Sequence, residues 1–103
     1  MKKAMSAFFI QFSPQAFDHL KYFSKRDQQM ILNAIDVHLS DQPDQETRKR
    51  KKLEENPLAP WELRVGDFRV FYDIDSDKHL VIIVAIGKKN HNILRIAGKE
   101  VSS

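Results

Sequence analysis

The feature that most constrains the fold of this chain is a β-hairpin signal at residues 61–74, which read WELRVGDFRVFYDI. Two runs of β-branched and aromatic residues flank Gly66-Asp67, and such a pair is typical of a tight primed turn in which glycine supplies a positive φ. This turn would pair Val65 with Phe68 and place Arg64 directly opposite Arg69 on one face. Because like charges in that position repel and weaken a sheet, the pair requires an explanation.

The two faces of the predicted hairpin differ in character. The expected core face carries Trp61, Leu63, Val65, Phe68, Val70 and Tyr72. The other face carries Glu62, Arg64, Arg69, Phe71 and Asp73. That second face has two interpretations. Either it is exposed, with Glu62 and Asp73 balancing the arginines through cross-strand pairs of ~0–1 kcal/mol each, or its arginine pair binds phosphate bidentately.

The rest of the chain predicts an α+β domain. Residues 7–12 alternate as a strand, and Ser13-Pro14 is a helix start with an apolar stripe through Phe17 and Leu20. A second helix, capped by Ser24 or Asp27, repeats apolar residues at helical spacing up to residue 39, with His38 on the stripe as a structural residue. Residues 80–86 are apolar on both faces, which indicates a central strand covered on both sides.

The resulting order, β-α-α-β-β-β, predicts a two-helix hairpin packed on one face of a small, mainly antiparallel sheet. At 103 residues the chain is expected to form one domain, spanning 1–103. It contains no cysteine, which excludes disulfides and thiolate chemistry and suits the cytoplasm. No apolar run approaches the ~18–20 residues of a membrane span. Gln11 and Pro14 interrupt the apolar stretch after the basic start, so no signal peptide is expected.

Basic residues gather in two further segments. The first is a run of five cations, which is either a solvated surface or an electrostatic funnel for nucleic-acid phosphates: Arg48, Lys49, Arg50, Lys51 and Lys52. The net charge of +3 favours a polyanionic partner only mildly. The second segment, residues 88–92, is expected to be a polar loop after the central strand and includes Lys88. If this loop lies near the arginine face, one anion-binding site, called here the anionic site, would be surrounded by Arg64, Arg69, Lys89, His91 and Arg95.

No metal or cofactor is expected at such a site. The four histidines show no ligand spacing, and the three glycines form no phosphate-binding loop. A metal-free basic cleft suits RNA cleavage by the 2′-hydroxyl of the RNA itself, because clustered cations stabilise the phosphorane and depress the pKa of a neighbouring lysine. His91 could act as acid or base.

The segments LRVGDFRVFY and IGKK, with the preceding strand, two helices and Lys51-Lys52-Leu53, resemble the RelE/ParE superfamily of type II toxin–antitoxin toxins over nearly the whole chain. The resemblance implies that superfamily's fold, ribosome-dependent cleavage of mRNA without metal, contacts with ribosomal RNA, and neutralisation by an antitoxin. Arg69 and Arg64 match basic positions on the two hairpin strands, where Arg69 would stabilise phosphate charge. Lys89 matches the basic residue that acts as general acid or stabilises the leaving group.

Two positions depart from the RelE pattern. Glu62 stands at the other basic position of the first hairpin strand, and the expected C-terminal aromatic falls near Leu94 or Arg95, so that its role is missing or passes to His91. These departures leave two alternatives open. ParE-like members share the fold and poison DNA gyrase as binding proteins, and an inactive homologue would only bind its antitoxin.

Overall fold

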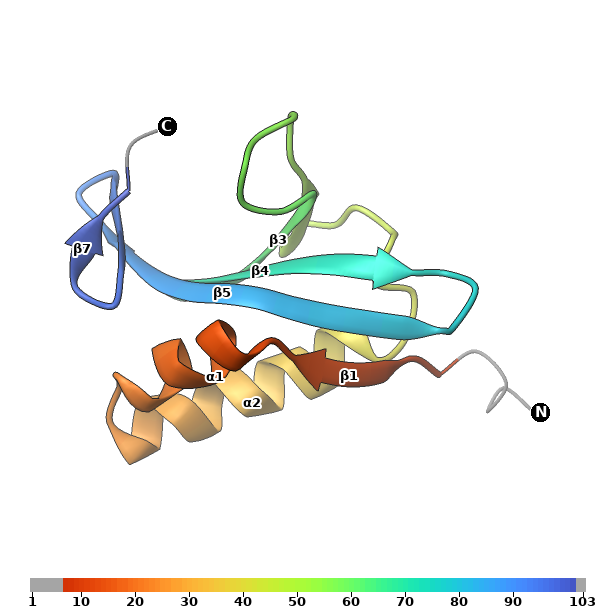
Figure 1. Ribbon diagram of the computed structural model, residues 1–103, viewed down its shortest axis with the longest axis horizontal. Coiled ribbons are helices and arrows are strands. Elements are labelled where there is room, and N and C mark those ends of the chain that lie inside the picture. The colour runs from red at the N-terminus through yellow and green to blue at the C-terminus, as the bar shows by residue number, and fades with distance from the viewer. Residues whose placement is uncertain (1–6, 102–103) are drawn as a thin grey trace.

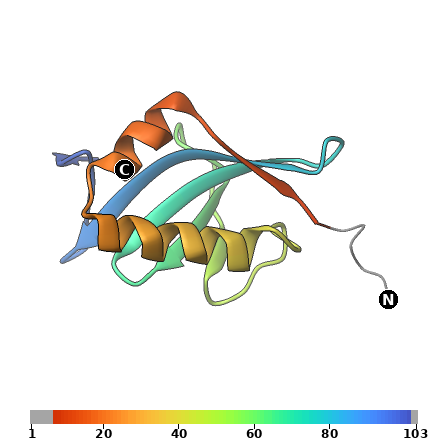
Figure 2. The ribbon, with the colours of Figure 1, turned by 90° about the horizontal axis from the view of Figure 1, so that it is seen from below.

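The computed structural model describes residues 7–101, in which two helices lie on one face of a twisted sheet (Figures 1 and 2). Residues 1–6, the basic start considered above, lie outside the described residues. The elements are β1 (Phe9–Phe12), α1 (Pro14–Lys21), α2 (Lys25–Leu39), β2 (Arg50–Lys52), β3 (Trp61–Val65), β4 (Phe68–Asp75), β5 (Leu80–Asn90), β6 (Ile93–Ile96) and β7 (Lys99–Glu100). The predicted α+β class, with two helices packed on a mainly antiparallel sheet, is confirmed.

The long strand β5 is the centre of the sheet. The strand order is β2-β3-β4-β5-β6-β7, and β1 also pairs with β5, in parallel, from Phe9 opposite Leu80 to Phe12 opposite Ile83. One edge of β5 therefore pairs with β4, while its other edge is shared between β1 and β6. The expectation of a central strand is confirmed, but β5 extends four residues beyond the predicted end at Ile86.

Serine side chains cap both helices. Ser13 Oγ accepts a hydrogen bond from Ala16 N at 3.1 Å and donates one to Val84 O at 3.1 Å, so it caps α1 and ties it to β5. Ser24 Oγ accepts from Asp27 N at 3.1 Å, which selects Ser24 as the cap of α2. The predicted stripe of α1 is wrong at Phe17, which is 52% exposed, because Ala16 and Leu20 turn toward the sheet instead.

The main core lies between the helices and the sheet. All six residues predicted for the core face of the hairpin are at most 8% exposed, and they pack against Leu20, Ile31 and Ile35 of the helices. Tyr72 is fully buried there, and its hydroxyl donates to Pro43 O at 2.8 Å.

A second, smaller core lies on the face of the sheet that the helices leave free. Phe71 is 3% exposed and packs with Ala59, Ala85 and residues of β6 and the 53–60 loop. The Asn56 side chain holds this loop through hydrogen bonds with Glu54 O, Leu58 N and the backbone of Ala59. The interpretation of the second hairpin face as wholly exposed is therefore wrong at Phe71.

The structure also contains strands that the sequence did not predict. Arg50–Lys52, within the run of five cations, forms the edge strand β2, and Lys99–Glu100 forms β7. Lys88, Lys89 and Asn90 belong to β5, so the predicted loop over residues 88–92 is wrong except for its last two residues. His91 and Asn92 form the β5–β6 turn, both with positive φ. No helix among residues 7–101 is long and apolar enough to span a membrane.

Candidate functional site

The β3–β4 hairpin pairs Arg64 with Arg69, as the sequence predicts. Gly66 in the turn has a φ of 58°, and a Cβ added to it would meet no atom within 4 Å. Glycine is therefore needed there for its backbone conformation and not for space. Because Leu63 and Val70 point into the helix-facing core, the two arginines lie on the opposite face of the sheet, called here the open face.

A carboxylate lies between the two guanidinium groups. Glu62 Oε1 is 3.6 Å from Arg64 Nε, and Glu62 Oε2 is 3.8 Å from Arg69 Nε. Glu62 is only 12% exposed, so solvent screens these contacts less than it screens a surface pair. The repulsion between the arginines is thus offset by one acidic neighbour on β3. Asp73 is directed elsewhere, since its Oδ1 accepts from Ile74 N at 2.7 Å.

The two arginines are held differently. Arg69 is 14% exposed, and its Nη1 donates to Gly66 O at 2.8 Å and to Phe68 O at 2.9 Å. Its buried Nε has no hydrogen-bond partner among the residues that the structure describes. Arg64 is 45% exposed. Arg69 is therefore a fixed cation, whereas the guanidinium of Arg64 is open to solvent and to a ligand.

Lys89 joins the arginines on the open face. Gly87 lies opposite Arg69 across β4 and β5, and Lys89 follows two residues later on the same face. The Lys89 N–H donates to Asp67 O at 2.7 Å, which ties this part of β5 to the β3–β4 turn. A Cβ on Gly87 would lie 2.6 Å from Arg95 O and 2.8 Å from Ile96 Cγ1, so only glycine lets β6 approach here.

The register places Lys88 and Arg95 away from this group. Lys88 lies opposite Phe68, whose ring belongs to the helix-facing core, and Lys88 Nζ is 5.5 Å from that ring. Arg95 lies opposite Lys88 and opposite Glu100. Lys88 and Arg95 are therefore on the helix side of the sheet. His91 is exposed at the tip of the β5–β6 turn.

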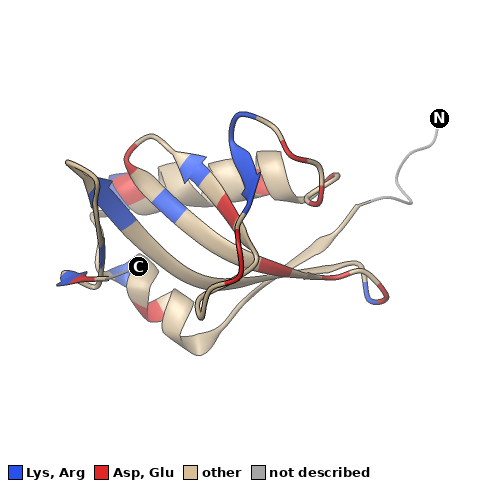
Figure 3. Ribbon diagram, turned by 90° about the horizontal axis from the view of Figure 1, so that it is seen from above, with Lys and Arg blue, Asp and Glu red and all other residues tan. Residues whose placement is uncertain are grey.

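The five-cation run is divided between two directions. Lys51 lies opposite Glu62 and shares the open face with the arginines. Arg50 points to the helix side, where its Nε donates to Gln45 O at 2.8 Å and its Nη1 to His38 O at 2.9 Å. Arg48 and Lys49 are exposed beside the end of β3, where Arg64 N donates to Lys49 O at 2.9 Å. Figure 3 views the open face and shows basic segments of β2, β3, β4 and β5 gathered toward one end of the sheet.

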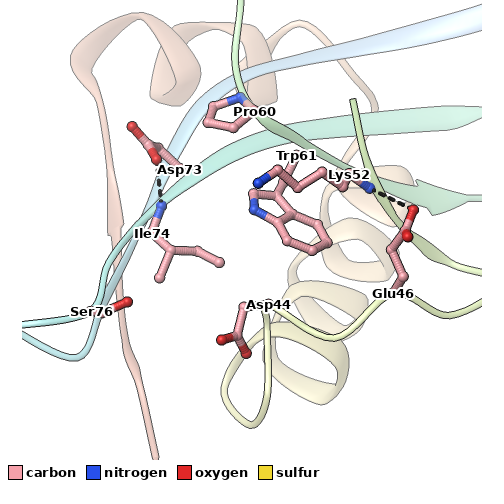
Figure 4. A pocket seen from close by; sticks show the side chains of 8 residues that line it. All are labelled: Asp44, Glu46, Lys52, Pro60, Trp61, Asp73, Ile74 and Ser76. Atoms are coloured by element: carbon pink, nitrogen blue, oxygen red, sulfur yellow. Dashed lines mark hydrogen bonds between the residues drawn. The ribbon is translucent and has the colours of Figure 1, made fainter. Parts of the chain in front are cut away.

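Lys52 belongs to a different part of the surface. The Lys52 Nζ lies 5.7 Å from the centre of the Trp61 ring, and the backbone N–H of Lys52 donates to Glu46 Oε2 at 3.1 Å (Figure 4). The hollow drawn in Figure 4 is also lined by Asp44 and Asp73, so carboxylates surround this lysine. The side chains of the basic run are therefore directed toward different parts of the surface.

Two histidines have perturbed acidity. Burial lowers the pKa of His19, which Asp18 partly offsets, and His19 Nδ1 accepts a hydrogen bond from Ile86 N at 3.2 Å. Burial lowers the pKa of His38 as well, and the charges of Lys49 and Arg50 lower it further. His38 was expected to be structural, and it packs partly buried at the end of α2. Among residues 7–101, no group of three or more His, Asp or Glu side chains is arranged to hold a metal ion.

Of the two acidic partners that one interpretation expected for the arginines, Glu62 contacts both, because its place two residues before Arg64 is a diagonal position relative to Arg69. One feature of this region was not predicted. Thr47 orders the start of the basic run, because its Oγ1 accepts from Lys49 N at 3.2 Å and Arg50 N at 3.0 Å. A threonine two residues before Lys49 is a known local turn signal and could have indicated this.

Residues 10–93 match the family model described as the ParE toxin of the type II toxin–antitoxin system, parDE. The chain belongs to the ParE toxin family. The predicted membership of the RelE/ParE superfamily is thus confirmed, and the chain is the toxin component of a type II toxin–antitoxin module. No curated protein matches it.

Two solved structures share the fold of this ParE-family toxin. One is the toxin–antitoxin complex RelBE2 from Mycobacterium tuberculosis, with a TM-score of 0.71 and 22% identity over 81% of this chain and 92% of that chain. The other is the archaeal RelE–RelB complex from Pyrococcus horikoshii OT3, with a TM-score of 0.66 and 20% identity over 82% of this chain and 98% of that chain. At these identities the likeness establishes the fold.

Proposed function

We propose that this toxin is an endoribonuclease that cleaves mRNA on the ribosome and so inhibits translation, with the open face of its sheet as the RNA-binding surface. The observation that carries the proposal is the grouping of Arg64, Arg69 and Lys89 on that face, from three neighbouring strands. Cations grouped in this way stabilise the negative charge that develops on a phosphorane. The proposed reaction needs no cofactor.

In the proposed reaction the 2′-oxygen of the RNA attacks the adjacent phosphorus, and the bond from phosphorus to the 5′-oxygen breaks. Arg69, held by two carbonyl groups, stabilises the phosphorane together with Arg64. Lys89 and His91 are the candidates for the acid and the base. Lys51, on the same face, and Lys88 and Arg95, at the neighbouring edge of β5, contribute binding of more distant phosphates.

Cleavage of mRNA on programmed ribosomes tests this function. Wild type is expected to cut, and Arg69→Ala and Lys89→Ala are each expected to lose about 10²–10³-fold in rate, as when one stabilising donor is removed. Arg26→Ala, at an exposed position of α2, is the matched control and is expected to retain most activity. Absence of cutting by the wild type would overturn the proposal.

We also infer that a cognate antitoxin binds this chain in the cytoplasm. The family is that of type II toxin–antitoxin systems, and both similar structures are complexes of toxin with antitoxin. Co-expression with the product of a short adjacent reading frame should relieve growth inhibition and yield a complex that co-purifies. Unrelieved toxicity with every neighbouring product would contradict this inference.

A second candidate function is inhibition of DNA gyrase as a binding protein. It is favoured by the match to the ParE model and by Glu62, whose carboxylate neutralises part of the arginine pair. A supercoiling assay distinguishes the two functions: inhibition of gyrase without cleavage of mRNA supports the second. If neither activity is found and the antitoxin still binds, the chain is an inactive homologue.

A further inference from the structure

A hollow at the edge of the sheet brings together three segments that are distant in the sequence. It is lined by the end of α2, the turn that leads into β2, and the β3–β4 turn: His38, Thr47, Arg48, Lys49, Arg50, Arg64 and Gly66. Four of these side chains are cationic, and none of the lining residues that the structure describes carries a carboxylate.

The backbone under these cations is held in place. Thr47 Oγ1 accepts from Lys49 N and Arg50 N, and Lys49 O accepts from Arg64 N. The guanidinium of Arg50 is bound to the carbonyl oxygens of Gln45 and His38, which orient it without cancelling its charge. The segment is thus preorganised, which reduces the entropy lost when a ligand binds.

The electrostatics of the hollow favour an anion. His38 lies in it, and the charges of Lys49 and Arg50 add to burial in lowering the His38 pKa, which is the response of an imidazole to a positive potential. Arg48 and Lys49 are exposed and form no ion pair with any described carboxylate. Their charges are therefore available to an incoming ligand.

Arg64 connects the hollow to the open face. Its side chain lines the hollow. Arg64 is also paired with Arg69 on the neighbouring strand β4, and the two strands are ~5 Å apart. A strand of nucleic acid whose scissile phosphate lies at Arg64 and Arg69 would therefore place a neighbouring phosphate at Arg48 and Lys49.

We propose that this hollow is a second phosphate-binding subsite, which holds the RNA backbone next to the position of cleavage. The proposal rests on the proposed function. The RNA is either the mRNA or a segment of ribosomal RNA, since both present the same phosphates. Arg48, Lys49 and Arg64 bind the phosphate, and Arg50 and Thr47 position the segment that carries them.

A pair of double variants tests the subsite. Arg48→Gln/Lys49→Gln removes two charges from the hollow. Lys25→Gln/Arg26→Gln removes two charges from the first turn of α2, outside both the hollow and the open face, and is the matched control. The probes are a single-stranded RNA with a 2′-deoxy nucleotide at the cut position, which cannot be cleaved, and ribosomes without mRNA.

The first double variant is expected to weaken binding about tenfold, as for two charge contacts, and to reduce the slope of log K against log salt by about 1.4. The control is expected to change binding less than about threefold. A defect confined to the oligonucleotide identifies mRNA as the ligand, and one confined to ribosomes identifies ribosomal RNA. Equal effects of the two double variants on both probes would overturn the subsite.

A spectroscopic measurement is independent of affinity. Binding of the oligonucleotide is expected to shift the imidazole resonances of His38, in the hollow. The resonances of His19, which accepts a hydrogen bond from Ile86 N, should stay unchanged.

Failure of the proposed subsite and failure of the proposed nuclease function are distinguishable. Cleavage that depends on Arg69 but not on Arg48 and Lys49 overturns only the subsite. RNA binding that depends on the hollow without any cleavage overturns only the nuclease.

Discussion

Arg64 and Arg69 lie directly opposite each other on β3 and β4, and they differ threefold in exposure, at 45% and 14%. The turn carbonyls of Gly66 and Phe68 hold Arg69, while Arg64 extends toward solvent. The Glu62 carboxylate approaches both. Two chemically identical side chains in one register pair therefore have different roles, since one is part of the hairpin and the other is available to a ligand.

Replacing each arginine by lysine should separate these roles. Arg69→Lys removes the guanidinium fork that reaches two carbonyl groups, so we expect a loss of about 1–2 kcal/mol in the free energy of unfolding. Arg64→Lys keeps an exposed charge and should change stability by less than about 0.5 kcal/mol. Urea denaturation followed by tryptophan fluorescence measures both. Equal destabilisation by the two changes would contradict the asymmetry.

Changing Glu62 tests whether its carboxylate limits the proposed cleavage. Glu62→Gln removes the charge between the arginines with little change in shape, and Glu62→Lys adds a cation at the same place. We expect RNA affinity to rise about fivefold in the first variant and further in the second, since each step removes about 1 kcal/mol of unfavourable interaction. Cleavage on programmed ribosomes should rise in the same order.

The cleavage rate of Glu62→Lys shows whether a missing cation at position 62 limits the reaction. A cleavage rate in Glu62→Lys that is unchanged or lower than that of wild type, with RNA affinity raised, would show that a missing cation is not the deficit at this position. Unfolding of Glu62→Lys should be measured in parallel, because the new lysine would lie opposite Lys51 and beside both arginines, and four adjacent cations on one sheet face are expected to cost about 1 kcal/mol.

The hairpin was predictable in detail because its signals are local. Period-two alternation fixed which side chains enter the core, and the Gly66-Asp67 pair set the register that joins Arg64 to Arg69. The same alternation predicted Phe71 on the second face but not its burial. That burial depends on the 53–60 loop, which folds over the sheet through the hydrogen bonds of Asn56.

The site was harder to predict because it depends on pairing between distant segments. A polar loop at residues 88–92 was a reasonable expectation, but pairing with β6 extends β5 through Lys88 and Lys89 and so assigns the two lysines to opposite faces. Whether Arg95 joins the arginines depends on this register and not on its own neighbourhood in the sequence. The burial of Glu62 between two arginines likewise needed the folded sheet.

Gly87 should be required for the β5–β6 pairing. A methyl group there would meet the Arg95 carbonyl oxygen, which is backbone and cannot move without breaking the pairing. We expect Gly87→Ala to lower the free energy of unfolding by about 1–3 kcal/mol, as for overpacking, and to speed amide exchange in residues 93–96. Gly66→Ala is the control: space is open there, so only the φ of 58° should cost about 1 kcal/mol.

The buried hydroxyl of Tyr72 should stabilise the connection between α2 and β2. It donates to Pro43 O at 2.8 Å, and burial raises its pKa. Tyr72→Phe leaves the Pro43 carbonyl without this donor, which should cost about 1–2 kcal/mol and lower Tm by roughly 4–12 °C in a domain of this size. Differential scanning calorimetry measures the change, and a Tm within 1 °C of wild type would mean that water replaces the hydroxyl.

Stability should fall as the solution becomes acidic, because of His19 and His38. Both have pKa values lowered in the folded chain, chiefly by burial, relative to 6.5 in the unfolded chain. Below pH 6.5 the unfolded chain therefore binds protons that the folded chain resists, so stability is present above that pH and is lost as the pH falls toward the folded pKa. Protonation of His19 Nδ1 would also remove the acceptor for Ile86 N.

Urea denaturation at two pH values tests this acid sensitivity. The midpoints at pH 5 and pH 7.5 should differ less in His19→Gln and in His38→Gln than in wild type. An unchanged difference in both variants would assign the acid sensitivity to other groups.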